Sequence, residues 1–232
     1  YLGRLVDSQP RSAIDRVVEV RVEAPEHEDD IVVRYADGGR SYLQAKEQLG
    51  ISGEPWRKLW INFEKQTSKA LHAGERFSLN LVTSKYTSDI GQLKELCERA
   101  HGKANTSEWL ESLNKRQLPI ANKIISALSQ STEDAAFEVL RNTEVWVWPL
   151  ERLEPDYIPL WIPQSSTESV ALFRILRDMV GSHARIRAVF RCSEILDRLS
   201  SVHNITVADA QHWGCDVYRQ TIIASMGRLS VP

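Results

Sequence analysis

The stretch that decides the fold consists of Asp30-Ile31-Val32-Val33, the turn Asp37-Gly38-Gly39, and the run Tyr42-Leu43-Gln44-Ala45-Lys46. A glycine pair between two short apolar runs predicts a β-hairpin. Side chains alternate between the two faces of a strand, so we expect Gln44 and Lys46 to share one face. Their neighbours Leu43 and Ala45 should then point into a core. The hairpin therefore predicts a carboxylate, an amide oxygen and an ammonium group close together.

These polar groups favour a particular chemistry. Carboxylate and amide oxygens are ligands that Mg²⁺ or Mn²⁺ prefers, so Asp30 and Gln44 are candidate metal ligands. The ammonium of Lys46 can orient a nucleophile or neutralise charge on a phosphoryl oxygen. The pattern thus predicts metal-dependent phosphodiester cleavage with Asp30, Gln44 and Lys46 as catalytic residues. The other interpretation, a solvated outer face of an ordinary hairpin, stays open.

The arrangement resembles the PD-(D/E)xK nuclease superfamily, in the D…QxK variant where glutamine replaces the second acid. Over about residues 16 to 101 it looks like the double-stranded-DNA nuclease effector domains of bacterial anti-phage defences of the cyclic-oligonucleotide-gated (CBASS) and STAND types. The resemblance implies a Mg²⁺- or Mn²⁺-dependent deoxyribonuclease that forms homo-oligomers. It also implies a fused sensor or NTPase module outside this fragment, and a leading helix that we expect before Tyr1. The sequence has no apolar run long enough for a membrane span and no signal pattern in its first ten residues, which predicts a cytoplasmic location.

The order of the expected elements agrees with that resemblance. Period-two alternation predicts strands and helical spacing predicts helices. The strands are expected at residues 16–24, 30–35, 40–47 and 77–82, and the helices at 56–71 and 89–101. The expected fold is therefore α/β, a restriction-endonuclease-like mixed sheet flanked by helices, with its core in residues 1–102.

Beyond Gly102 the chain is expected to form a mainly helical extension, residues 103–232, that docks copies or connects to downstream modules. Predicted helix starts are Thr106 or Ser107, and Ser131, while Ser165 and Glu168 form a capping box for a helix that stops at Gly181. Further helices are expected at 118–128, 193–202 and 207–226. Residues 144–149 alternate as a strand, buried on both faces or at a subdomain seam.

Other acidic residues near the hairpin complicate the assignment. Glu28 or Asp29 takes the place of Asp30 if the strand starts earlier. Glu19 and Glu23 share a face of the first strand, so either is a candidate further acid. A polar outer face of an edge strand is the other interpretation.

Three lysines on the predicted helix 56–71 form a stripe opposite its aromatic residues. Lys58, Lys65 and Lys69 are candidate contacts for DNA phosphates, or simply solvated side chains. Trp56 and Trp60 share helical spacing with Leu59, which favours the core over base stacking.

Composition limits the remaining possibilities. The chain has 232 residues, 42% of them hydrophobic and 26% charged, and a net charge of −2. This charge is not that of a basic nucleic-acid-binding domain. If the chain binds DNA, its positive charge must therefore be concentrated in one part of the surface. No apolar run approaches the ~20 residues of a membrane span, and the three cysteines have no C-x-x-C spacing. Phosphate-loop, dinucleotide and nucleophile-elbow motifs are absent from the sequence.

Two hypotheses follow from the sequence. In the first, the chain is the nuclease effector part of a larger defence protein and cleaves double-stranded DNA when a sensor assembles several copies. In the second, it is a catalytically silent, nuclease-like module for interaction or oligomerisation. The neutral Gln44 and the slightly acidic total charge motivate the second hypothesis.

Overall fold

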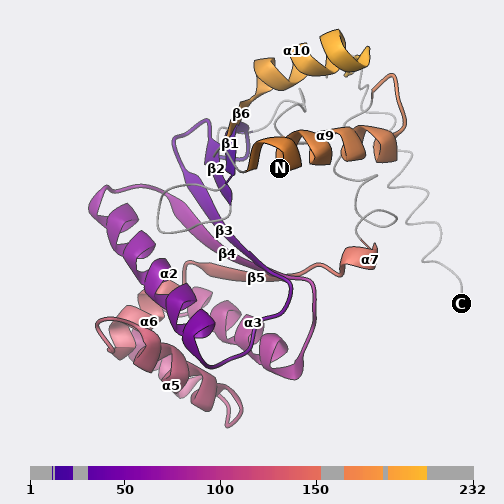
Figure 1. Ribbon diagram of the computed structural model, residues 1–232. Helices are drawn as coiled ribbons and strands as arrows, with labels where there is room; N and C mark the ends of the chain where they lie inside the picture. The colour runs from indigo at the N-terminus through magenta and orange to yellow at the C-terminus, as the bar shows by residue number, and fades with distance from the viewer. Residues whose placement is uncertain (1–11, 13, 23–30, 153–164, 185–187, 208–232) are drawn as a thin grey trace, which may run out of the picture.

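A computed structural model of the protein describes residues 12, 14–22, 31–152, 165–184 and 188–207. The described chain is an α/β protein, with an open, six-stranded mixed sheet between two layers of helices (Figure 1). This confirms the predicted mixed sheet flanked by helices. Among the described residues, no helix has the length and apolar character needed to cross a bilayer.

The sheet has the order β5-β4-β3-β2-β1-β6. Its strands are β1 (Val17–Val22), β2 (Ile31–Tyr35), β3 (Arg40–Lys46), β4 (Phe77–Thr83), β5 (Thr143–Val147) and β6 (Val189–Arg191). The first three strands form an antiparallel meander, β4 and β5 run parallel to β3, and β6 pairs antiparallel with β1. The predicted hairpin and the predicted strand at 77–82 are thus confirmed.

The first helical layer packs on one face of the sheet and forms the larger core. It contains α2 (Glu54–His72), α3 (Ser88–His101), α4 (Thr106–Glu111), α5 (Gln117–Ala127) and α6 (Glu133–Leu140). Tyr42 and Leu79 from the sheet join Trp60, Trp109 and Ile124 from the helices in this core. The boundary predicted at residue 102 falls inside it, because α4 to α6 and β5 share its packing.

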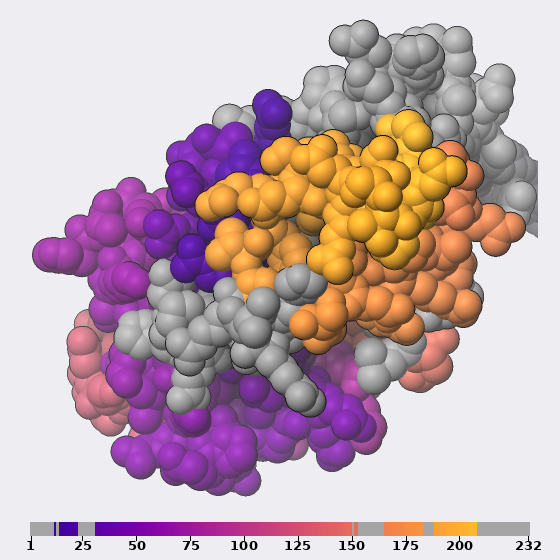
Figure 2. Space-filling model, turned by 45° about the horizontal axis from the view of Figure 1, so that its top comes forward, coloured from indigo at the N-terminus to yellow at the C-terminus, as the bar shows by residue number. Residues whose placement is uncertain are grey.

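The second helical layer covers the opposite face near β1 and β2. It consists of α9 (Ser169–Ala184) and α10 (Cys192–His203), while the short α7 (Leu150–Arg152) follows β5. Val20, Val33 and Leu43 from the sheet pack with Leu172 and Leu199 from these helices. Figure 2 shows this layer, in orange and yellow, beside the indigo strands of the N-terminal part.

The last predicted strand is an edge strand of the main sheet. Its Glu144 is exposed and Trp146 only partly buried, which contradicts the first of the two expected alternatives, burial on both faces. The two tryptophans that alternate with its valines stack on each other, with ring centroids of Trp146 and Trp148 5.1 Å apart.

Helix ends account for several small differences from the sequence prediction. The side chain of Asn105 caps α4 by accepting from the Glu108 amide, so neither Thr106 nor Ser107 is the cap. Ser131 has a left-handed φ of 49°, which leaves Thr132 to cap α6.

The predicted capping box of the helix after residue 165 is also wrong. Helix α9 begins at Ser169 and continues through Gly181. The Ser165 hydroxyl bonds instead to the backbone of Thr167, and Ser165 forms a β-bridge with Val207. The helix predicted at 207–226 lies outside the described residues, apart from its first position.

Candidate active site

Gln44 and Lys46 lie at the end of the sheet where the carboxyl ends of several strands meet. Lys46 pairs with Thr83, and Thr83 with Val147, so β3, β4 and β5 end in one row. On the other side of β3, Leu43 pairs with Ile31 at the start of β2. In open α/β sheets, ligands commonly bind at the carboxyl ends of the parallel strands. Gln44 and Lys46 therefore lie at the end of the sheet where a site is expected.

Gln44 and Lys46 belong to the face of β3 that packs toward α2 and α3. Tyr42, two residues before Gln44, is fully buried in the larger core, and side chains two residues apart share a face. Gln44 itself is 3% exposed and Lys46 is partly buried. Gln44 and Lys46 lie on the same face of β3, as expected from the alternation of side chains along a strand. The side chain of Gln44, however, is buried in the larger core.

The neighbours of Gln44 differ from each other. Leu43 points into the smaller core, as predicted. Ala45 is exposed, so its predicted burial is wrong. In the described part of the chain, α9 and α10 pack over the β1 and β2 side of that face.

The acidic residues predicted for the site separate into two groups. Asp30, Asp29, Glu28 and Glu23 lie outside the described residues. Glu19 is described, and its carboxylate forms ion pairs of 3.5 Å with Arg21 and with Arg191.

The position of Glu19 in the sheet separates it from Gln44. Glu19 pairs with Arg34, which pairs with Arg40 at the far end of β3. Four residues of strand separate Arg40 from Gln44, or roughly 13 Å at the usual rise. Glu19 is therefore poorly placed to act together with Gln44 and Lys46.

The backbone just after Lys46 is tied to the neighbouring connection between β4 and α3. The hydroxyl of Ser84 donates to the carbonyl oxygen of Glu47 at 2.9 Å, and Lys85 Nζ lies 3.3 Å from the Glu47 carboxylate. Thr83, 1% exposed, also places its hydroxyl 3.5 Å from the same carbonyl. These contacts fix the end of β3, and the sequence alone gave no signal for them.

At the opposite end of the hairpin, an ion pair holds the turn. Arg76 donates to both carboxylate oxygens of Asp37, at 2.7 and 2.9 Å, and the Gly39 amide donates to one of them at 2.9 Å. The hydrogen bond from Arg76 is the largest of the causes that lower the pKa of Asp37 to about 2. A Cβ at Gly39 would lie 2.4 Å from the guanidinium, so glycine permits this approach. These contacts fix the turn between β2 and β3, and the turn sets the pairing register of the two strands.

The basic stripe and the tryptophans of α2 occupy opposite sides of the helix. Lys58, Lys65 and Lys69 are exposed, so they are accessible to a ligand. Trp56 and Trp60 are buried, with their rings edge to face and centroids 5.3 Å apart. Their predicted place in the core is confirmed.

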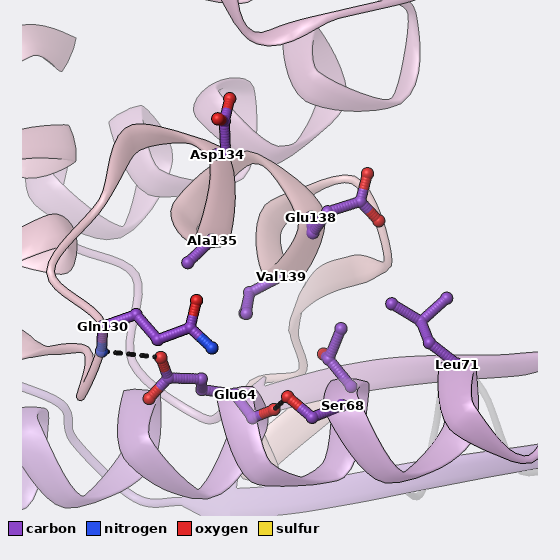
Figure 3. A pocket seen from close by; sticks show the side chains of 9 residues that line it. Glu64, Ser68, Leu71, Gln130, Asp134, Ala135, Glu138 and Val139 are labelled. Atoms are coloured by element: carbon purple, nitrogen blue, oxygen red, sulfur yellow. Dashed lines mark hydrogen bonds between the residues drawn. The ribbon is translucent and has the colours of Figure 1, made fainter.

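A cavity of about 260 Å³ lies between α2 and α6, and neither Gln44 nor Lys46 is among its lining residues (Figure 3). The buried Glu64 on its floor accepts hydrogen bonds from the Ser129 and Gln130 amides at 2.7 and 3.0 Å. Asp134 and Glu138 also line the cavity, but Figure 3 shows their carboxylates turned away from Glu64. These acids do not converge on one point, and Glu64 serves the packing of the helices.

A second cavity, of about 310 Å³, lies between α3 and β5 and is lined by Cys97, His101, Glu144 and Trp146, among others. Burial raises the pKa of the Cys97 thiol, which keeps the thiol protonated and unreactive. Across the described part of the chain, no group of three or more His, Cys, Asp or Glu side chains is placed to hold a metal ion.

Comparison with known proteins adds no family assignment: no protein-family model matches the sequence, and no curated protein matches it either.

Proposed function

We propose that this chain is a metal-dependent endonuclease that cleaves double-stranded DNA as an effector of bacterial anti-phage defence. The observation that carries the proposal is the position of Gln44 and Lys46 at the end of β3, beside the strand pair of Ile31 and Leu43. Asp30 directly precedes Ile31 in the chain, and Gln44 directly follows Leu43. In sequence, each of these residues directly adjoins a member of the Ile31 and Leu43 strand pair.

The topology supports the same proposal. An antiparallel meander of β1, β2 and β3 continues through α2 into β4, which is parallel to β3. This is the element order of the restriction-endonuclease-like fold that the sequence resembles. Fold alone does not define activity, so the proposal rests on the residues at the strand ends.

In the proposed site, Asp30 and the side-chain oxygen of Gln44 would hold Mg²⁺ or Mn²⁺, because both supply the oxygen ligands that these ions prefer. A divalent cation bound there would act as a Lewis acid on the phosphodiester. Lys46 would neutralise the charge that accumulates on the phosphoryl oxygens. The exposed Lys58, Lys65 and Lys69 of α2 would contact backbone phosphates without reading the base sequence.

The proposal includes the setting that the resemblance implies. The nuclease would act in the cytoplasm as a homo-oligomer, assembled by a fused sensor or NTPase module. Assembly would bring several cleavage sites to one duplex, which supports double-strand cleavage by a module with a single site.

One observation favours the second hypothesis, a catalytically silent interaction module. Gln44 is only 3% exposed, and a buried amide is poorly placed to share a hydrated metal ion. In this version the nuclease-like sheet serves as a scaffold and the helical layers bind a partner.

Plasmid cleavage with Mg²⁺ or Mn²⁺ tests the proposal, using the full-length parent protein under conditions that assemble it. Lys46→Ala should lower the cleavage rate by about 100-fold or more, the usual loss when one charge-stabilising group is removed. Lys123→Ala on α5 is the matched control, because Lys123 is exposed and far along the chain from the hairpin; its cleavage should equal that of the parent.

Two results would contradict the proposal. Equal cleavage by the parent and Lys46→Ala would remove Lys46 from the site. No cleavage by the assembled parent, together with no calorimetric heat on addition of Mn²⁺, would favour the silent module.

A further inference from the structure

Tyr86 is an exposed aromatic side chain at the same edge of the sheet as Lys46. It lies in the connection between β4 and α3, three residues after Thr83, the strand partner of Lys46, and it is 69% exposed. A single exposed apolar side chain is ordinary on a protein surface. Tyr86 differs from the ordinary case because its ring has a specific support.

The support is Gly91 in the first turns of α3. A Cβ built on Gly91 would lie 2.4 Å from the Tyr86 hydroxyl oxygen and 3.0 and 3.2 Å from two ring carbons. The phenol end of the ring therefore rests against the helix where any other residue would carry a side chain. The absence of a side chain at position 91 lets the ring lie close to the helix while most of its surface faces solvent.

Side chains on both sides of Tyr86 contact neighbouring parts of the chain. Before it, Ser84 and Lys85 contact Glu47 at 2.9 and 3.3 Å. After it, the Thr87 hydroxyl caps α3 by accepting from the Ile90 amide at 3.2 Å. An aromatic side chain has few rotatable bonds, so it loses little conformational entropy when it binds a flat partner.

The ring is also close to the proposed cleavage site. One strand spacing and three residues of chain separate the Cα atoms of Lys46 and Tyr86, a distance of at most about 16 Å. Bases follow one another at about 3.4 Å along a DNA strand. A strand whose phosphate lies at Lys46 can therefore bring a base over Tyr86 within about five nucleotides.

We propose that Tyr86 is a stacking platform for an unpaired base of the nucleic-acid substrate, and that Gly91 positions it. This inference rests on the proposed nuclease function and adds a preference for strands with frayed, nicked or single-stranded character next to the cleaved bond. Stacking on an aromatic ring is tolerant of base identity. The platform would thus strengthen binding without making the site sequence-specific.

The test measures binding of a short single-stranded oligonucleotide that carries one 2-aminopurine, with Ca²⁺ in place of Mg²⁺ to prevent cleavage. The full-length protein is compared with Tyr86→Ala, Tyr86→Phe and Gly91→Ala. Stacking quenches 2-aminopurine fluorescence, and fluorescence anisotropy of a dye at the other end of the strand reports affinity. Circular dichroism of every variant checks its fold.

Tyr86→Ala should lower the affinity about tenfold, within the range measured for loss of one stacking aromatic, and abolish the quenching. Tyr86→Phe keeps the ring and should behave as the parent does. Gly91→Ala should weaken quenching although it removes no ring atom, because its methyl group displaces the phenol. The same substitution improves helix propensity, so a folding defect is not expected to account for the loss.

The outcomes separate this inference from the proposed function. Parent-like affinity and quenching in Tyr86→Ala would overturn the platform, even if Lys46→Ala abolishes cleavage. Loss of quenching in Tyr86→Ala, with cleavage unchanged in Lys46→Ala, would keep the platform and reject the catalytic assignment. No binding of the oligonucleotide by the parent protein would reject the platform outright.

Discussion

Replacing Glu64 should destabilise the whole described α/β unit, because its carboxylate joins α2 to the connection between α5 and α6. The side chain is 6% exposed and accepts two backbone hydrogen bonds, from Ser129 and Gln130. A hydrogen bond to a charged group contributes about 1.5–3 kcal/mol. The two donors belong to exposed residues. Water can therefore bond to these amides when the carboxylate is removed, which offsets part of the lost free energy.

These numbers give an expected loss of about 2–4 kcal/mol in the free energy of unfolding for Glu64→Ala. Glu64→Gln keeps one acceptor oxygen and should lose about half as much, since its amide nitrogen cannot accept. For a protein of this size the Ala variant should melt roughly 5–15 °C below the parent. Glu98→Ala is the control, because the Glu98 side chain is 60% exposed and its loss should cost less than about 0.5 kcal/mol.

Urea unfolding followed by tryptophan fluorescence measures these differences, because Trp60 and Trp109 lie in the core that Glu64 supports. A single transition that shifts to lower urea concentration with an unchanged slope is expected. A loss as small as that of Glu98→Ala would refute the reasoning. Two separate transitions would show that residues on either side of position 102 unfold independently. The hydrogen bonds of Glu64 would then not lie within one cooperative unit.

Two further predictions concern titratable groups outside the candidate site. The pKa of Asp37 is lowered from 3.8 to about 2, mainly by Arg76, so the ionised form stabilises the fold above pH 3.8 and this contribution is lost as the pH falls toward 2. The stability difference between the parent and Asp37→Asn, measured by urea unfolding, should therefore shrink over that interval, and a difference that grows on acidification would contradict the assignment. The pKa of the Cys97 thiol is raised by burial, so Cys97 should resist iodoacetamide in the native protein and react in urea. Mass spectrometry of the labelled peptides measures this, and labelling of native Cys97 as fast as in urea would disprove its burial.

Much of the fold follows from local patterns in the sequence. The alternation in β1, β2 and β3 and the glycines at the turn predicted three strands and the hairpin of β2 and β3, because strand period and turn geometry are local properties. The helical spacing of Trp56, Leu59 and Trp60 predicted α2 and its buried face for the same reason.

Other features depended on partners distant in sequence. The sequence predicted a strand near residue 145, but its place beside β4 is a parallel pairing made across α3 to α6. Parallel partners are separated by a long connection, and nothing in the local pattern of a strand specifies which neighbour it will find. One core contains residues from both sides of position 102, where the sequence predicted a boundary.

At the candidate site, the sequence by itself determined that Gln44 and Lys46 share a face, because alternation along a strand fixes this without any tertiary contact. Only the tertiary structure decided that this face lies under the larger core, that Gln44 is buried, and that Glu19 is held by Arg21 and Arg191 instead. It also placed Tyr86 against Gly91 at the end of β4. The physical reason is that periodicity sets the direction of a side chain, whereas its burial and neighbours depend on which helices pack over it.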